Sequence, residues 1–319
     1  MIVSKTPLRI SFVGGGTDNL IQHNFDGNVI STTIDKFIYV GLNKKFDDTI
    51  RFSYSKTENV KNINFIQHQM LRETFKYFNI LKGLEIISVA DIPSFGSGLG
   101  SSSSFLVGVI NLINHYKKLG LTKHDIAKIA CRIEINILKK PIGMQDQYNA
   151  VYGGLKWYKF YKKKHVKVIN INISKQRLKN FHQKLFLVYT NQVRKSEKIL
   201  SKVKKKTNLN SLFEISQLAR EFKKELVSGD LNMLGKLLHQ NWLIKKTLSK
   251  NTTNNKIEKL YDYGINSGAI GGKLLGAGGG GFILFFVDKK NQKKFKNRFP
   301  DKQILDFNFY EKGSELIEL

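Results

Sequence analysis

A stretch rich in glycine and serine, residues 93–104, has the residue types needed to bind phosphate groups. It reads Pro-Ser-Phe-Gly-Ser-Gly-Leu-Gly-Ser-Ser-Ser-Ser and leads into an apolar segment, residues 105–119, that we predict to be a buried helix. Glycines let backbone N–H groups approach a ligand closely, and a helix start adds a positive dipole end. The alternative is a flexible linker, but a linker need not lie between a strand and an apolar helix. The Gly-Lys-Ser/Thr ending of the common phosphate loop is absent.

Three other clusters combine glycine with charged or polar side chains. Residues 14–18 read Gly-Gly-Gly-Thr-Asp and end a strand-like stretch, residues 2–13, that carries Arg9. Residues 143–147 read Gly-Met-Gln-Asp-Gln, and residues 271–281 contain four consecutive glycines before an apolar strand. Taken singly, each has an ordinary explanation as a solvated strand face, a turn aspartate or a tight turn. Taken together, in their order and spacing along the chain, they are more informative than any one of them alone.

The elements that position these clusters are strands and helices in irregular order. We predict further strands at residues 29–34, 37–42, 50–54, 84–90, 155–160, 166–171, 186–189 and 282–287, and helices at 63–78, 122–138, 211–226 and 230–248. Hairpins are mixed with helices, without regular βα alternation, so the predicted class is α+β. We expect two domains, residues 1–180 and 181–319.

Composition excludes several classes of protein. The 319 residues are 41% hydrophobic, which is enough for a folded core, and a single cysteine, Cys131, excludes a disulfide scaffold or a cysteine-based zinc cluster. No apolar run reaches the length of a membrane helix, and the N-terminus lacks the pattern of a signal peptide. We therefore expect a cytoplasmic protein with no membrane partner. The oligomeric state stays open, a homodimer included.

The strong positive charge does not by itself indicate nucleic acid. Lys and Arg total 53 and Asp and Glu 25, a formal net charge of +28, but only eight of the basic residues are arginine. Arginine is the residue favoured for bidentate contacts to bases and phosphates, and the lysines are spread along the chain. We expect no nucleic-acid partner, and the charge is compatible with an anionic small substrate.

The order and spacing of the four clusters resemble those of the GHMP kinases, a family that includes galactokinase, homoserine kinase, mevalonate kinase and phosphomevalonate kinase. The resemblance covers nearly the whole chain, and its most specific mark is the Gly-x-Gly-Leu-Gly-Ser-Ser block at residues 96–102. It implies a two-domain α+β kinase with its active site in the interdomain cleft, using ATP and Mg²⁺.

The resemblance also implies a role for each position. Asp146 accepts the proton of the substrate hydroxyl or orients it, and Arg9 keeps this carboxylate ionised. Ser102 reaches Mg²⁺, with Glu134 as its acidic partner. The ATP phosphates lie against Gly96, Ser97, Gly98, Leu99, Gly100, Ser101 and Ser102. The substrate lies against Gly15, Gly16, Thr17, Asp18, Gly143, Gln147, Arg194, Gly278 and Gly279.

Within the family, residues 6–18 and 143–147 most resemble bacterial kinases of D-glycero-D-manno-heptose 7-phosphate. This implies transfer of the ATP γ-phosphoryl group to the C1 hydroxyl, giving heptose 1,7-bisphosphate for GDP-heptose and surface polysaccharide. Gly15 and Gly16 replace two larger side chains of the sugar-kinase pattern, and Arg194 is either a partner for the substrate phosphate or a solvated helix residue. Two alternatives remain: a kinase of an unphosphorylated sugar such as fucose or galactose, and a basic nucleic-acid-binding protein on a kinase scaffold.

Overall fold

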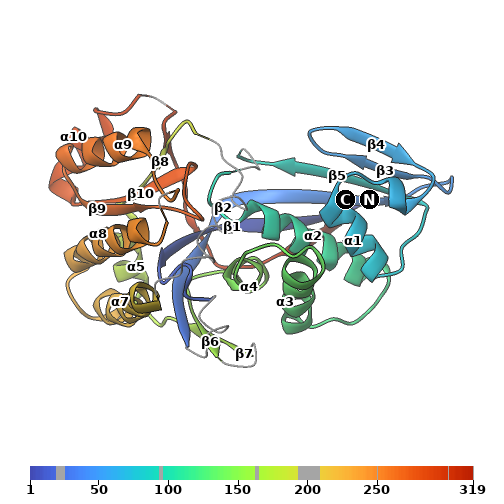
Figure 1. The fold of residues 1–319 in the computed structure, drawn as a ribbon, viewed down its shortest axis with the longest axis horizontal. Coiled ribbons are helices and arrows are strands. Elements are labelled where there is room, and N and C mark those ends of the chain that lie inside the picture. Colours follow the sequence, from blue (N-terminus) through green and yellow to red (C-terminus); the bar gives the residue numbers. More distant parts are fainter. Residues whose placement is uncertain are drawn as a thin grey trace.

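The structure is a computed structural model that describes residues 1–18, 26–92, 96–161, 165–192, 209–249, 251–300 and 302–318. Two halves lie side by side, and the chain termini meet in the first of them (Figure 1). Ile2 pairs with Glu318 on neighbouring antiparallel strands, which fixes the two ends together.

A mixed sheet forms the centre of the first half. Its main order is β13-β1-β2-β5-β3-β4, with β6, β7 and β12 attached through β2. The strands are β1 (Ile2–Val13), β2 (Gly27–Lys44), β3 (Ile50–Ser53), β4 (Thr57–Val60), β5 (Leu84–Ala90), β6 (Lys156–Tyr161), β7 (His165–Asn170), β12 (Phe309–Tyr310) and β13 (Glu315–Glu318). Neighbouring β1 and β2 are long and almost wholly buried, because the remaining elements cover them.

The helices of the first half are α1 (Gln69–Tyr77), α2 (Ser101–Tyr116), α3 (Lys123–Cys131) and α4 (Gln145–Tyr152). Helix α2 packs on β1 and β2, and most of its side chains are buried, as the apolar sequence after the glycine loop predicts. Thr122 caps α3 through a capping box with Asp125, which confirms the predicted helix start. The helix then continues as a π-helical turn, Arg132–Ile137, that carries Glu134.

A second, four-stranded sheet forms the other half, in the order β11-β8-β10-β9. Its strands are β8 (Leu185–Tyr189), β9 (Ala269–Leu274), β10 (Phe282–Val287) and β11 (Ile304–Leu305), and its helices are α5 (Lys175–His182), α7 (Leu209–Val227), α8 (Leu231–Thr247), α9 (Asn255–Asn266) and α10 (Gln292–Lys296). All six residues of β10 are buried at the centre of this sheet. Helix α7 also contacts β1 and β2, and α8 contacts β1, so the two halves share a packed interface.

The predicted α+β class is confirmed, and most predicted elements are present. The strands expected at 29–34 and 37–42 are parts of one strand, β2, whose pairing with β1 shifts register between Pro7 and Leu8. Several elements, β9 and α9 among them, were not predicted from the sequence. The domain boundary at residue 180 stays a prediction, but the last strands, β12 and β13, pair with the first sheet rather than the second.

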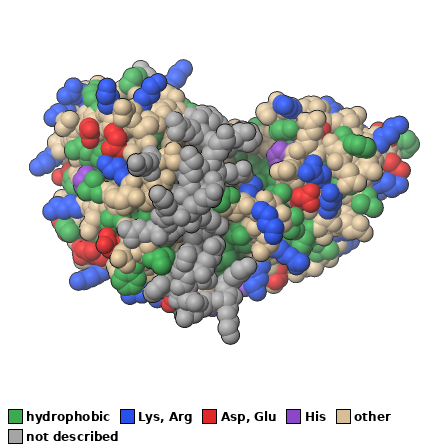
Figure 2. Space-filling view, viewed as in Figure 1, with side chains coloured by type: hydrophobic (Ala, Val, Ile, Leu, Met, Phe, Trp, Pro, Cys, Tyr) green, Lys and Arg blue, Asp and Glu red, His purple; other side chains and the backbone are tan. Residues whose placement is uncertain are grey.

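Charged side chains are dispersed over the face shown in Figure 2. Lys and Arg side chains lie on both halves, interspersed with Asp and Glu, on the part of this face that the structure describes. Within the described ranges, no helix is long and apolar enough to cross a membrane. The expected absence of a nucleic-acid partner remains a prediction.

Candidate active site

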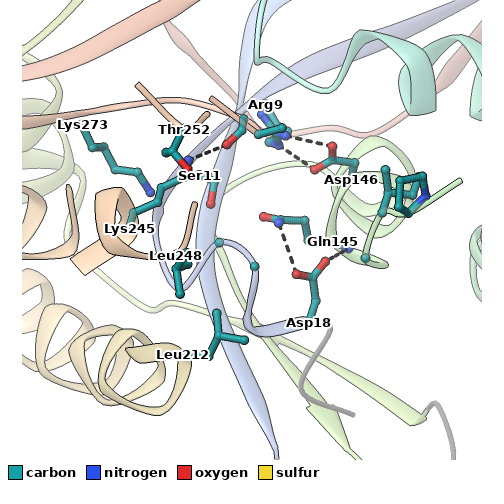
Figure 3. A pocket seen from close by; sticks show the side chains of 17 residues that line it. Arg9, Ser11, Asp18, Gln145, Asp146, Leu212, Lys245, Leu248, Thr252 and Lys273 are labelled. Atoms are coloured by element: carbon teal, nitrogen blue, oxygen red, sulfur yellow. Dashed lines mark hydrogen bonds and ion pairs between the residues drawn. The ribbon is translucent and has the colours of Figure 1, made fainter. Parts of the chain in front are cut away.

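A cleft of about 960 Å³, open to solvent, lies where the two halves meet. Strand β1 and the start of α4 form one wall, and α7, α8 and β9 form the other (Figure 3). The residues that line it come from positions 9 to 277 of the chain. The packing of the two halves therefore brings the separate sequence clusters into one place.

The Arg9 guanidinium and the Asp146 carboxylate form a bidentate ion pair at the centre of this cleft. Nε and Nη2 of Arg9 each donate to one oxygen of Asp146 at 2.8 Å, and Nη1 donates to the Gly98 carbonyl at 2.6 Å. Arg9 is 5% exposed, whereas the Asp146 side chain is 27% exposed and faces the cleft. Two parallel charge-assisted bonds fix the orientation of the carboxylate, so its accessible edge is presented to a ligand.

Asp18 forms a second carboxylate site on the same wall. The Gln145 backbone N–H donates to its Oδ2 at 3.0 Å, and the side chain is almost fully buried. Burial raises the pKa of Asp18 to about 6; the nearby Asp146 adds to this rise, and the Gln145 hydrogen bond opposes it. A Cβ at position 143 would lie 1.9 Å from Asp18 Oδ2, so any larger residue there would displace this carboxylate.

We expect Asp18→Asn to stabilise the ligand-free protein at pH 8. A carboxyl pKa raised from 3.8 to about 6 means that folding becomes less favourable as the pH rises through this window, and the full penalty is present above pH 6. Asparagine carries no such penalty. The variant's free energy of unfolding should therefore exceed that of the wild type by on the order of 1 to 3 kcal/mol at pH 8, and this difference should shrink as the pH falls toward 4. Thermal unfolding at pH 5 and pH 8 measures this. Exposed Asp262→Asn is the control, and an equal difference at both pH values contradicts the prediction.

The glycine and serine loop lies at the edge of the cleft and leads into α2. Gly98 has a φ of 75°, and a Cβ there would lie 2.7 Å from the Leu275 carbonyl, so a side chain is excluded by both conformation and space. Gly100 begins α2 without a side-chain cap. The first N–H groups of α2 are therefore available to an anion, as the sequence predicts. Residues 93–95 lie outside the described residues.

Glu134 and Ser102 meet beside the start of α2. The Glu134 carboxylate is fully buried and accepts hydrogen bonds from Ser102 Oγ at 3.0 Å, Ser103 Oγ at 2.6 Å and Gln147 Nε2 at 2.6 Å. Lys140 Nζ lies 3.2 Å from the same carboxylate and 3.0 Å from Ser102 Oγ. Ser102 is the exposed member of its serine run. A buried carboxylate and an accessible hydroxyl are oxygen donors of the kind that Mg²⁺ takes.

A second hollow adjoins the Ser102 side of α2, and aromatic rings line it. The rings of Phe52 and Tyr54 stack at 4.5 Å, and His68 packs edge-on against both. The other residues that line the hollow include Met70, Ser101, Ser102, Phe105, Leu138 and Lys140. Such a surface suits a flat, largely apolar group next to the glycine and serine loop.

Two lysines that the sequence analysis did not assign to the site line the central cleft. Lys245 Nζ donates to the carbonyls of Leu274, at 3.2 Å, and Gly276. Lys273 is 2% exposed, on β9. A signal existed for Lys245, because it falls on the apolar face of the predicted helix 230–248. The corresponding signal for Lys273 was the presence of a charged residue inside the glycine-rich block.

The other predicted substrate residues divide into two groups. Gly15 and Gly16 line the cleft. Thr17 is fully buried, and its hydroxyl bonds to the backbone of Asn28, so the structure does not bring it to the cleft.

Gln147 faces Glu134 instead of the cleft. Gly278 and Gly279 pack against the Thr252 backbone and are not among the residues that line the cleft. Arg194 lies outside the described residues.

Comparison with known proteins defines the class of this chain. Residues 64–154 match the family model described as GHMP kinases N terminal domain, and residues 222–304 match GHMP kinases C terminal. The chain therefore belongs to the GHMP kinase family, whose members are ATP-dependent phosphotransferases, and the resemblance seen in the sequence is confirmed.

The relatives that are similar to this chain include kinases named for sugars. The D-glycero-alpha-D-manno-heptose 7-phosphate kinase of Campylobacter jejuni is 33% identical, over 98% of this chain and 97% of that protein. The L-fucokinase/L-fucose-1-P guanylyltransferase of Bacteroides fragilis is 26% identical over 93% of this chain, which corresponds to 36% of that protein. The crystal structure of a D-glycero-D-manno-heptose 1-phosphate kinase from Bacteroides thetaiotaomicron superposes with a TM-score of 0.82 over 100% of this chain and 99% of that one; at 21% identity it shows the shared fold.

Proposed function

We propose that the protein transfers the γ-phosphoryl group of ATP to the C1 hydroxyl of D-glycero-D-manno-heptose 7-phosphate, in the cytoplasm, to supply GDP-heptose synthesis for surface polysaccharide. The observation that carries the proposal is the Arg9–Asp146 ion pair, held beside the phosphate-binding loop in a cleft lined by a second carboxylate and two lysines. The full-length similarity to the Campylobacter enzyme supports the choice of sugar.

In the proposed reaction, Asp146 accepts the proton of the attacking hydroxyl. The C1 oxygen then forms a bond to the γ-phosphorus as the bond from that phosphorus to the β–γ bridging oxygen breaks, and ADP leaves. Arg9 keeps Asp146 oriented and ties it to the loop through the Gly98 carbonyl. Asp18 accepts hydrogen bonds from other hydroxyls of the sugar and fixes its orientation.

Ser102 and Glu134 would hold Mg²⁺, since they supply one hydroxyl and one buried carboxylate at the start of α2. A magnesium ion held by these residues would supply positive charge that neutralises and orients the phosphates. Lys140 already balances the Glu134 charge in the ligand-free protein, which accounts for a carboxylate buried without a metal. The aromatic hollow next to Ser101 and Ser102 would take the nucleoside.

The test is ADP release with Mg²⁺-ATP across a panel of acceptors: D-glycero-D-manno-heptose 7-phosphate, D-mannose 6-phosphate, D-mannose, L-fucose, D-galactose and mevalonate. We expect kcat/KM for the heptose phosphate to exceed that of every other acceptor at least about tenfold, because each missing carbon or polar group loses contacts in the transition state. Phosphorus NMR of the product reports the position of the new phosphate.

Turnover confined to fucose or galactose would overturn the choice of a sugar phosphate and favour the unphosphorylated-sugar alternative, which the similarity to the fucokinase supports. Turnover confined to mevalonate would overturn the choice of any sugar. A phosphate added at a position other than C1 would overturn the proposed attacking hydroxyl.

A further inference from the structure

The two halves of the cleft carry opposite charge. Asp18 and Asp146 line one wall, whereas Lys245 and Lys273 enter from the opposite wall (Figure 3). Asp146 is already paired with Arg9. The cleft thus has a wall of oxygen acceptors suited to hydroxyl groups and, facing it, a wall of ammonium groups suited to an anion.

Lys273 has no partner that explains its burial. It is 2% exposed and, within the described part of the chain, no hydrogen-bond acceptor or carboxylate partners its ammonium group. Burial and the positive charges of Lys245 and Arg9 lower the pKa of Lys273 well below its usual value. A buried, unpaired charge next to like charges costs several kcal/mol, so a structural role for this lysine has no support in its surroundings.

Two groups near Lys273 also favour a role in binding an anion. The Ser11 hydroxyl lines the cleft and, among the residues described, is buried with no hydrogen-bond partner. Lys245 uses its ammonium on the carbonyls of Leu274 and Gly276, which hold it at the edge of the glycine-rich segment after β9. Burial and the nearby Arg9 lower the pKa of Lys245 to about 7, a direction that a bound anion would reverse.

We propose that Lys273, Lys245 and Ser11 form the site for the phosphate that the sugar substrate already carries, distinct from the loop that binds the ATP phosphates. This proposal rests on the proposed function and names the part of the cleft that distinguishes a sugar phosphate from a free sugar. It replaces Arg194 as the primary partner of that phosphate. In this arrangement the phosphate lies against α8 and β9 while the reacting hydroxyl lies against Asp146.

The direct test uses inorganic phosphate as the probe. The protein is saturated with Mg²⁺ and a non-hydrolysable ATP analogue, which occupies the nucleotide phosphate positions, and phosphate is titrated by calorimetry. We expect Lys273→Met and Lys245→Met each to weaken phosphate binding about 10- to 100-fold, the effect of losing one charge-assisted hydrogen bond. Lys246→Met is the matched control, because Lys246 is next to Lys245 on α8 but is paired with Glu258.

A folding control accompanies this test. Lys273→Met removes an unpaired buried charge, so its melting temperature without ligand is expected to equal or exceed that of the wild type. Lys245→Met loses two hydrogen bonds and can lose stability, so Lys273→Met is the decisive variant. Wild-type phosphate affinity in a folded Lys273→Met overturns the proposal.

Kinetics separate this proposal from the proposed function. With D-mannose 6-phosphate and D-mannose as a matched pair, Lys273→Met should raise KM for the phosphorylated sugar by a much larger factor than KM for the free sugar. A fall in kcat for both sugars at constant KM would overturn the proposal, because it would place Lys273 on the transferring phosphoryl group. Lysine-dependent phosphate binding without turnover of any sugar phosphate would support the anion site while the proposed function fails.

Discussion

Asp146→Asn is expected to lower kcat about 10²- to 10⁴-fold, the usual contribution of a positioned proton acceptor. The loss falls on the chemical step, because an asparagine side chain cannot accept a proton at neutral pH. The Asp146 carboxylate faces the cleft with 27% of its side chain exposed, and Arg9 donates one hydrogen bond to each of its oxygens. The asparagine side chain has one acceptor for the two N–H donors of Arg9, so its orientation also loosens.

The measurement is steady-state kinetics together with nucleotide affinity. Binding of a fluorescent ATP analogue should stay within a few-fold of wild type, because Asp146 lies outside the phosphate loop and the aromatic hollow. Asp262→Asn makes the same chemical change on the exposed face of α9 and serves as the control. If Asp146→Asn turns over substrate at the wild-type rate, Asp146 has no catalytic role. The ion pair between Arg9 and Asp146 would then serve only to join α4 to β1.

The sequence could single out the glycine and serine loop as a candidate phosphate-binding element because the chemistry of such a loop is local. A glycine run, a helix start and a serine at the first turn are adjacent in the chain, so one window of sequence contains the whole feature. The extent of β5 (Leu84–Ala90) and the cap at Thr122 were predicted for the same reason. Local signals alone did not single out Asp146, which has the sequence context of an ordinary turn residue; the family resemblance assigned it to the site, and the structure places it at the start of α4 rather than in a turn.

Other parts of the site depend on tertiary packing, which no single window shows. Lys245 lies on the face of α8 that pattern analysis assigns to the core, and only the packing of α8 on β9 reveals that this face borders the cleft. Thr17 and Asp18 are adjacent, yet the first is bonded to Asn28 and the second faces the cleft. Strand β9 escaped prediction because glycines, which disfavour strands, occupy half of its central positions.

Glu134→Gln is expected to raise the Mg²⁺ concentration that half-saturates activity by about 10- to 100-fold or more, since loss of even an indirect metal contact has effects of that size. The glutamine is uncharged and offers one oxygen where the glutamate offers two. The substitution also places an N–H donor opposite Gln147, where the glutamate had an acceptor. The side-chain oxygen of Gln147 is buried without a partner among the described residues, so rotation of the Gln147 amide lets this oxygen accept the new hydrogen bond. The fold therefore tolerates the change at a cost of about 1 to 3 kcal/mol.

Comparing Lys140→Met with Glu134→Gln shows whether Glu134 binds the metal or has only a structural role. Both variants break the Lys140–Glu134 ion pair, which has a 3.2 Å separation and a fully buried carboxylate, so both should lower the melting temperature. Only Glu134→Gln removes an oxygen that Mg²⁺ can bind. Lys140→Met instead removes the competing cation and should leave the half-saturating Mg²⁺ concentration at or below its wild-type value. Equal Mg²⁺ requirements in both variants and the wild type would make Glu134 an anchor for Lys140 and α2, with Ser102 left as the protein's contribution to the metal site.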